Sequence, residues 1–366
     1  MARPGLIDRR TFMAGAGAAF AAGLSGRATA ALAGTDALFA AAFRGHDGAW
    51  GVGILTEQGK VVHTVALPAR GHDVTFDPVS GRSVVFARQP GAFLVVFDHQ
   101  GRAAPVTIAS IAGRHFYGHG VFSPDGALLY ATENDFDNAA GMVGVYDASD
   151  AFRRVGEFPT YGIGPHELLL LPDGRTLAVA NGGIETHPDF GRAELNLATM
   201  QPSLTLVDRV TGDLVERHVL ETALHQLSIR HMDIDGSGAL WFGCQHRGPD
   251  AERPPLVGRL KRGDGPDLIV LPDDALGAMR NYVGAVAANR QAGTVALSSP
   301  QGNALLVLEA ASGRLIARRD LAEVCGLASD GADFLATTGA GAIVPAAGEA
   351  VMDAEHSWDN HVLRVR

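Results

Sequence analysis

Short apolar runs separated by turns rich in Pro, Asp and Gly recur along most of the chain. Each unit has an apolar strand, a turn, and a second apolar strand that ends in small residues. The turn is clearest at residues 124–126 and 172–174, which both read Pro-Asp-Gly. The units begin roughly 40 to 60 residues apart. Six units share the pattern, at residues 74–87, 121–131, 169–180, 232–242, 284–298 and 326–336.

A third apolar run follows most of these pairs, and it usually ends in an acidic residue before another turn. A fourth run comes next, as at residues 315–318. Short β runs joined by turn residues, four to a unit, indicate antiparallel hairpins, and a four-stranded sheet repeated at this period predicts a β-propeller. The third runs are found at residues 93–98, 143–147, 204–208 and 305–309, with 361–365 as a candidate last member.

The segment over residues 37–67 supplies three further strands before the first Pro turn. Counting it gives seven blades, one of them shared between the two chain ends, which closes the ring and removes free sheet edges. The sequence therefore predicts an all-β, seven-bladed β-propeller of four-stranded antiparallel blades, as a single domain over residues 34–366. Six blades and a pair of β-sandwiches are the alternatives.

The N-terminal segment has the features of an export signal. Arg9 and Arg10 precede Phe12, an Ala/Gly-rich run covers residues 14–24, and small residues suited to cleavage follow near Ala30. The segment resembles a twin-arginine signal, which exports proteins that are already folded. An ordinary secretory signal or an amphipathic helix is the alternative. We expect residues 1–33 to be removed and the mature protein to be periplasmic.

Composition narrows the classes of function. With 46% hydrophobic and 19% charged residues, the chain is too apolar to be disordered. A formal net charge of −10 without a long Lys/Arg run argues against nucleic acid and anionic membranes as partners. Beyond the N-terminal run, no segment is long and apolar enough to predict a membrane span. We expect the protein to be a monomer. Two cysteines exclude a disulfide-built scaffold. Export would permit a bond between Cys244 and Cys325, although their spacing does not require one.

Histidines recur at one position of the repeat. Alignment on the Gly turns places His119 and His231 at equivalent sites, and His166 one residue away with Glu167 in the equivalent place. His72 lies close to this position in a blade whose turn is one residue longer. The first strand of a blade lines the central channel, and its start lies near one mouth, where loops converge. Neutral imidazole suits copper, iron, zinc and nickel. We therefore expect a metal site formed by His119, His166 and His231, with His72 nearby.

The carboxylates beside these histidines, Asp73 and Glu167, are candidate ligands or acceptors that fix the imidazole tautomers. Two other interpretations remain open. Channel histidines can simply bind water and backbone, and a shared repeat ancestry can leave the same residue in several blades without a function.

The loops after the second strands are expected to border the same mouth. They contribute candidate cofactor-binding residues. The alternative is that these are ordinary polar residues of solvent-exposed loops. A further alternative is a calcium site with oxygen ligands only, over residues 133–135. Residues 187–200 are either a lid or docking insertion or a plain connection. Residues 356–361 contain Trp358 and two histidines. They are either a further contribution to the rim or, as we expect for Trp358, part of the packing of the closing strand. The candidate cofactor-binding residues, with His72 and Glu167, are Glu133, Asn134, His246 and Arg247.

Several catalytic and cofactor motifs are absent from the sequence. It has no Gly-x-Ser-x-Gly elbow, phosphate loop, His-Glu-x-x-His or Cys-x-x-Cys-His motif. Covalent c-type haem is therefore excluded, whereas non-covalent haem stays open.

The repeat resembles the YVTN-type and quinoprotein-like propellers. With the export signal, it resembles more narrowly the bacterial periplasmic family called domain of unknown function 1513, over nearly all of the mature chain. That family has no established activity to carry over. Its members are often encoded beside imelysin-like iron-uptake proteins and di-haem peroxidase-like proteins, so the resemblance implies a role in periplasmic iron or haem-related traffic with such partners. The residues that carry it are 117–123 (YGHGVFS), 164–167 (GPHE) and 228–232 (SIRHM).

The sequence thus favours a periplasmic propeller that binds a metal ion, iron or copper, or a haem-related ligand at the channel mouth. The first alternative is an enzyme in the same pocket, a lyase, lactonase or redox enzyme, in which histidine acts as general acid or base and Arg247 or Arg230 stabilises an anion. The second alternative is a protein-docking scaffold whose histidines are structural.

Overall fold

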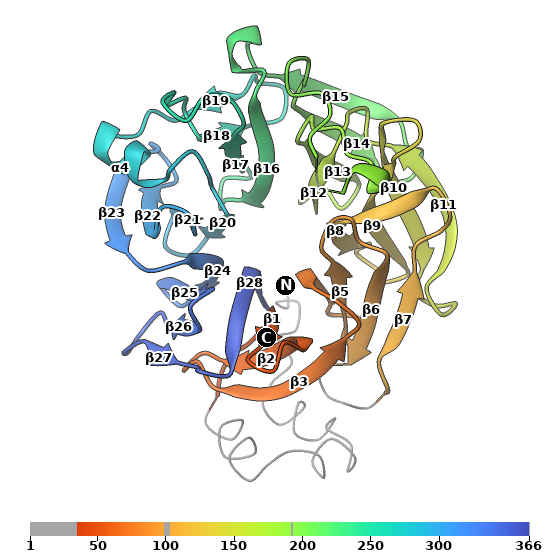
Figure 1. Ribbon diagram of the computed structural model, residues 1–366, viewed down its shortest axis with the longest axis horizontal. Coiled ribbons are helices and arrows are strands. Elements are labelled where there is room, and N and C mark those ends of the chain that lie inside the picture. The colour runs from red at the N-terminus through yellow and green to blue at the C-terminus, as the bar shows by residue number, and fades with distance from the viewer. Residues whose placement is uncertain (1–34, 99–102, 192, 366) are drawn as a thin grey trace.

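The computed structural model of the protein describes residues 35–98, 103–191 and 193–365. Over these residues the strands form seven four-stranded antiparallel sheets, which surround a central channel as blades (Figure 1). The blades are numbered here in chain order around the ring. The prediction of an all-β, seven-bladed propeller is confirmed.

Each blade is given from its innermost to its outermost strand. Blade 1 contains β28 (His356–Arg364), β1 (Leu38–Gly45), β2 (Trp50–Thr56) and β3 (Val61–Leu67). Blade 2 contains β4 (Gly71–Asp77), β5 (Arg82–Ala87), β6 (Phe93–Asp98) and β7 (Val106–Ala109). Blade 3 contains β8 (Arg114–Phe122), β9 (Leu128–Asp135), β10 (Ala140–Asp147) and β11 (Arg153–Pro159). Blade 4 contains β12 (Pro165–Leu170), β13 (Thr176–Asn181), β14 (Ser203–Asp208) and β15 (Leu214–Val219).

The remaining blades follow the same order. Blade 5 contains β16 (Leu227–Ile234), β17 (Leu240–His246), β18 (Val257–Leu260) and β19 (Asp267–Leu268). Blade 6 contains β20 (Ala285–Asn289), β21 (Thr294–Ser299), β22 (Ala304–Glu309) and β23 (Leu315–Asp320). Blade 7 contains β24 (Val324–Asp330), β25 (Asp333–Thr338), β26 (Ala342–Val344) and β27 (Val351–Met352). Short helices lie in the connections: η1 (Pro188–Phe190), η2 (Thr222–Leu224) and α4 (Asp273–Ala278).

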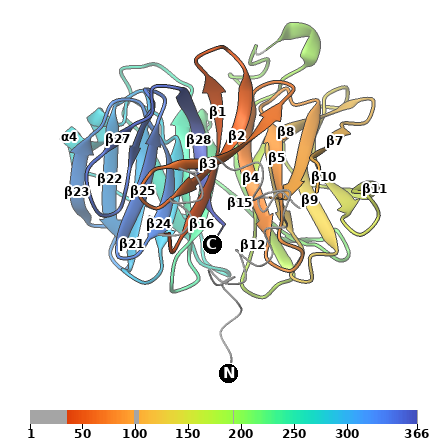
Figure 2. The ribbon, with the colours of Figure 1, turned by 90° about the horizontal axis from the view of Figure 1, so that it is seen from below.

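Burial along the strands follows from the face-to-face stacking of the blades, seen edge-on in Figure 2. The middle strand β13 is buried at every position, whereas the outer strand β11 alternates between exposed and half-buried residues. A middle strand contacts a neighbouring sheet on both faces, so all of its side chains are buried. An outer strand has one face exposed to solvent, so its residues alternate between buried and exposed positions. Apolar clusters fill the interfaces between neighbouring blades, for example Val84, Phe86 and Leu129 between blades 2 and 3.

The Pro-Asp-Gly turns join the first two strands of blades 3 and 4. In blade 3, Asp125 Oδ1 accepts a hydrogen bond from the Ala127 amide at 3.1 Å, and Gly126 has φ = 68°. This left-handed conformation favours glycine. Gly174, with φ = 66°, has the same role in blade 4. The repeated turn residues thus set the hairpins on which the blade prediction depends.

The two chain ends share blade 1. Strand β28 pairs antiparallel with β1, with Phe39 opposite Arg364 and Ala41 opposite Val362. Trp358 on β28 is buried and meets Phe43 of β1 edge-on, with ring centroids 5.8 Å apart. The predicted closure by both chain ends and the packing role of Trp358 are therefore confirmed.

The predicted signal peptide, residues 1–33, lies outside the described residues. Within the part of the chain that the structure describes, no helix has the length and apolarity needed to cross a membrane. Cys244 and Cys325 are both buried and unbridged.

Candidate metal centre

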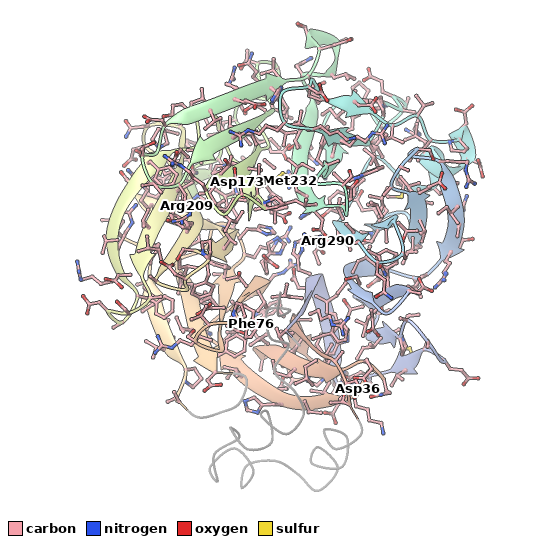
Figure 3. The ribbon with its side chains drawn as sticks, turned by 180° about the vertical axis from the view of Figure 1, so that it is seen from behind. Asp36, Phe76, Asp173, Arg209, Met232 and Arg290 are labelled. Atoms are coloured by element: carbon pink, nitrogen blue, oxygen red, sulfur yellow. The ribbon has the colours of Figure 1, made fainter. Side chains whose placement is uncertain are left out.

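Five histidines of the described chain converge at the centre of the ring, from the innermost strands of five consecutive blades. Neighbouring imidazole centroids lie 4.6 to 5.1 Å apart around a closed circle. Figure 3 shows side chains of the innermost strands pointing into the ring, where Met232, next to His231 on β16, is labelled. We call these residues the histidine cluster: His361 on β28, His72 on β4, His119 on β8, His166 on β12 and His231 on β16.

Irregular pairing near the start of the inner strands aims these rings inward. The register shifts between Gly71 and Val74, between Phe116 and Gly120, and at the corresponding points of β12 and β16. A bulge re-aims side chains and interrupts the period of two. Within the bulge of β8, Gly118 has φ = 115°, and a Cβ there would lie 2.6 Å from Cδ2 of His72. Glycine at this position therefore lets the rings approach one another.

Carboxylates hold three of the rings by their Nδ1 atoms. A ring whose Nδ1–H donates to a carboxylate carries its proton there and leaves the Nε2 lone pair available, which is the usual arrangement around protein-bound metals. The Nδ1 atoms donate as follows: His72 to Asp359 Oδ1 at 2.9 Å, His119 to Asp73 Oδ2 at 3.2 Å, and His231 to Glu167 Oε2 at 3.3 Å.

The Nε2 atoms of the cluster either have no partner from the protein or lie close to one another. Those of His72, His119 and His361 are buried and have no hydrogen-bond partner among the described residues. The Nε2 atoms of His166 and His231 lie 3.4 Å apart. Two imidazole nitrogens bound tetrahedrally at about 2.1 Å to one ion also lie about 3.4 Å apart. Two sets, His72/His119/His166 and His119/His231/His361, each keep their ligand atoms within 4.8 Å of one another. The cluster can therefore hold a metal ion.

Burial keeps the rings in the form that binds metals. It lowers the pKa of His72, His166 and His231 well below the usual range, and lowers that of His361 to about 4. These imidazoles are thus neutral at pH 7, and no proton has to leave before they bind a metal. Burial, together with Asp73, raises the pKa of Glu167 well above its usual range. A bound cation would favour its ionised form.

Open space lies on both sides of the cluster along the channel. A cavity of about 60 Å³, the upper cavity, is lined by Tyr117, His166, Ser228 and Arg230 among others. A larger space of about 320 Å³ is lined by residues that follow the histidines, such as Asp233. Along β16, Arg230 lines the upper cavity, His231 belongs to the histidine cluster, and Asp233 lines the larger space. The cluster therefore separates the two.

Two predicted mouth residues have other positions. Glu133 and Asn134 belong to strand β9 and not to the loop beyond it, where the sequence pattern had placed them. Glu133 is buried inside blade 3 and accepts hydrogen bonds from Tyr146 Oη at 2.5 Å and Arg154 Nη2 at 2.7 Å. Asn134 donates to the carbonyl oxygen of Thr186 at 3.1 Å. Arg154 pairs with Glu133, and Arg114 pairs with Asp135 at 3.0 Å, so both carboxylates of the calcium alternative are already neutralised.

The other predicted mouth residues lie at the end of β17. His246 is outside the cluster, with Nε2 3.1 Å from Glu252 Oε2. Arg247 donates from Nε and Nη2 to Glu194 Oε2, at 3.0 and 2.6 Å. Glu194, from the connection between β13 and β14, lines the upper cavity. Arg247 is thus joined to the cavity wall through this ion pair, and the long connection forms part of that wall.

Sequence reasoning missed His361 and Asp359. Both lie on β28, where residues 359 and 361 point to the channel and Trp358 points to the opposite face, against Phe43. Alternate residues of a strand face opposite sides, so the run HSWDNH could have shown that Asp359 and His361 share one face and Trp358 the other. The run ends the last repeat and does not begin one, so alignment of the repeats does not place His361 with His119 and His231.

The fold and the site together define a seven-bladed β-propeller with a histidine cluster in its channel that can hold a metal ion. The sequence pattern of the family described as "Protein of unknown function (DUF1513)" matches residues 65–365, and the chain belongs to this family. The family resemblance inferred from the sequence is confirmed. No curated protein matches the chain.

Two solved structures share the architecture. Kuenenia stuttgartiensis hydrazine synthase is similar with a TM-score of 0.60 and 17% identity, covering 83% of this chain and 90% of the other. The Cps50 (Swd1) β-propeller domain of Myceliophteria thermophila has a TM-score of 0.57 and 14% identity, covering 79% and 89%. At these identities the similarity shows the fold alone.

Proposed function

We propose that this chain is a periplasmic propeller that binds a transition-metal ion, iron or copper, at the histidine cluster and acts as an accessory in handling that metal. His119, His166 and His231 are the predicted ligands. His72 and His361 complete the ligand set available around the ion.

The observation that carries the proposal is the orientation of the rings by carboxylates. Asp359, Asp73 and Glu167 each hold a ring at Nδ1, which leaves the Nε2 atoms of these rings available to an ion. A buried polar atom left without a partner costs about 1–3 kcal/mol. Several such atoms facing one point would be costly in a purely structural cluster, and a bound ion offsets the cost. This arrangement favours a metal ligand role over the structural alternative.

The donor set favours particular metals. Imidazole nitrogens suit iron, copper, zinc and nickel, whereas calcium and magnesium prefer oxygen ligands. The resemblance to a family encoded beside iron-uptake proteins favours iron within this set, with copper as the second candidate. The upper cavity, at about 60 Å³, fits a bare ion and its small ligands better than a macrocycle, so the proposal is an ion rather than haem.

Elemental analysis of the protein exported through its own signal tests the proposal. We expect near-stoichiometric iron or copper in the wild type and its loss in a His119→Ala/His166→Ala/His231→Ala variant that keeps the wild-type circular dichroism spectrum. His46→Ala, on an exposed turn, is the matched control and should keep the metal. Absence of metal from the wild type, even after anaerobic reconstitution, would refute the proposal. It would favour the alternative that the protein is a scaffold for protein docking.

The location and partners belong to the same proposal. An Arg9→Lys/Arg10→Lys variant should leave the full-length precursor in the cytoplasm, while an Arg27→Lys variant is exported normally. Cell fractionation distinguishes the two, and export of both variants would contradict the twin-arginine route. Imelysin-like and di-haem peroxidase-like exported proteins are the first partners to test by pull-down.

A further inference from the structure

We propose that the upper cavity binds a small anion of the size and charge of formate, directly beside the metal ion. The inference rests on the proposed metal site, because the anion would occupy an exchangeable position of the ion. It assigns to the site a class of exogenous ligand, small carboxylates and similar monoanions.

The first argument is the charge of the cavity wall. Arg230 lines the cavity, and its buried Nε has no hydrogen-bond partner among the residues that the structure describes. The carboxylate that also lines this cavity, Glu194, already accepts two hydrogen bonds from Arg247. Among the described residues no carboxylate lies within ion-pair distance of Arg230, and a cation in a confined site without such a partner is unfavourable. A small anion would satisfy the Arg230 guanidinium, which matches carboxylates in a bidentate manner.

The second argument is the set of neutral donors around Arg230. Tyr117 lines the cavity with a phenol hydroxyl, which can donate a hydrogen bond to a ligand. The Ser228 hydroxyl is buried, lines the cavity and has no partner within the described chain. Gln89 donates to the Thr186 hydroxyl at 2.8 Å, and Tyr117 Oη lies 3.3 Å from that same hydroxyl. Whichever of the two hydroxyls donates to the other, one of them keeps its proton for a ligand. The wall therefore offers a ligand the Ser228 hydroxyl and one hydroxyl of the Tyr117–Thr186 pair beside the Arg230 guanidinium.

The third argument is size. A cavity needs a volume of about 10–15 Å³ to hold one water molecule, and pockets for drug-sized ligands measure about 300–1,000 Å³. At about 60 Å³, the upper cavity holds an ion of a few heavy atoms and not a sugar, a nucleotide or an aromatic acid. This restriction selects formate-sized anions among possible ligands.

The fourth argument is position. His166 lines the upper cavity and is also a member of the histidine cluster. On β8, Tyr117 is two residues before His119, and on β16 Arg230 immediately precedes His231. An anion held by Arg230 and Tyr117 thus lies next to the ion that the histidines would bind. Metal sites that exchange ligands keep such an open position, whereas structural sites are closed.

The experiment is a titration of copper(II)-loaded protein with formate, followed by visible absorption and electron paramagnetic resonance. We expect saturable spectral changes with formate and none with benzoate, which exceeds the cavity. In Arg230→Gln, checked first for full copper content, the formate Kd should rise about ten- to a hundredfold, as expected for loss of a charged hydrogen bond. Arg217→Gln, on the outer strand β15, is the matched control and should leave the formate Kd unchanged.

Tyr117→Phe provides a second variant that preserves the shape of the wall. It should raise the formate Kd about three- to tenfold, and it decides the question if Arg230→Gln fails to fold or to hold copper. A wild type that holds no metal overturns both this inference and the proposed function. A copper-loaded wild type whose spectra ignore formate, or variants with unchanged formate Kd, overturn only the anion site.

Discussion

His72 and Asp359 stand 287 positions apart in the chain, yet His72 Nδ1 lies 2.9 Å from Asp359 Oδ1. The contact joins β4 of blade 2 to β28, the strand by which the chain end completes blade 1. Arg70 Nε also donates to Asp359, at 2.6 Å from Oδ2, which fixes the carboxylate. The orientation of one predicted ligand therefore depends on closure of the ring.

Asp359→Asn tests the role of this carboxylate. The amide keeps the shape of the side chain but removes the charge that holds the Nδ1 proton of His72. Loss of such an outer contact typically lowers metal affinity ten- to a hundredfold. We expect a change of about this size in competition titrations against a chromophoric chelator. Asp320→Asn, on the outer strand β23, should have no effect, and an unchanged affinity in Asp359→Asn would mean that the carboxylate does not tune the site.

His361→Ala tests the ligand that sequence reasoning missed. We expect metal affinity to fall at least as far as in Asp359→Asn, since a ligand atom itself is removed. The control is on the same strand: His356 stacks on Trp358, with centroids 5.4 Å apart, on the face away from the channel. His356→Ala should therefore keep wild-type metal content by elemental analysis. Equal metal loss in both variants would point to disruption of β28 rather than to a missing ligand.

Gly118→Ala tests the close approach of the rings. Alanine at φ = 115° is strained by about 1–3 kcal/mol, and its Cβ would lie 2.6 Å from the His72 ring. We expect urea denaturation to show a loss of stability of about this size, together with weaker metal binding. Gly156→Ala, on outer strand β11, meets nothing within 4 Å of the added Cβ. The two variants should differ clearly, and equal behaviour would contradict the packing argument.

Trp358→Ala tests closure of the ring. Trp358 is buried on the face of blade 1 that packs against blade 7, and removing a buried Trp side chain costs about 3–5 kcal/mol. We expect a decrease in the free energy of unfolding within that range. Phe190→Ala, at a position 62% exposed, should change it by less than about 0.5 kcal/mol. A small effect of Trp358→Ala would show that closure is held by the strand pairing alone.

The cysteines should be unreactive in the folded protein. Burial raises the pKa of Cys325 to about 12 and also raises that of Cys244, so almost no thiolate is present at pH 8. Ellman's reagent should detect no thiol in the native protein. In guanidinium chloride without reductant it should detect both. Detection of none in denaturant would mean that the two are joined by a disulfide, contrary to the structure.

The blades were predictable because their signal is local. The Pro-Asp-Gly turns need a left-handed glycine, as at Gly126 and Gly174, and each apolar run between them is buried whatever the partner blade contributes. The turn residues and the apolar runs of one hairpin lie close together in the chain, so both can be recognised in a single sequence. The family resemblance and the repeated histidines followed from the same repeats.

The site was predictable only in part because its geometry is not local. The bulges near Gly71 and Pro165 insert extra residues, so counting from the turns could place His72 and His166 only approximately. His361 comes from the opposite chain end, and no repeat alignment compares it with His119. Glu133 was misplaced because β9 extends further than its apolar residues indicate, its polar end being stabilised by Tyr146 and Arg154.

The shared blade also sets when the site can exist during synthesis of the chain. The ribosome adds β28 only after the strands of blades 2 to 7 have been made. Asp359 and His361 are therefore among the last described residues to emerge, while their partner His72 is among the first. A nascent or truncated chain that stops before Asp359 has most of its blades but neither the closing strand nor the full set of nitrogen ligands. Metal uptake would thus report that translation has passed this point and that the ring has closed.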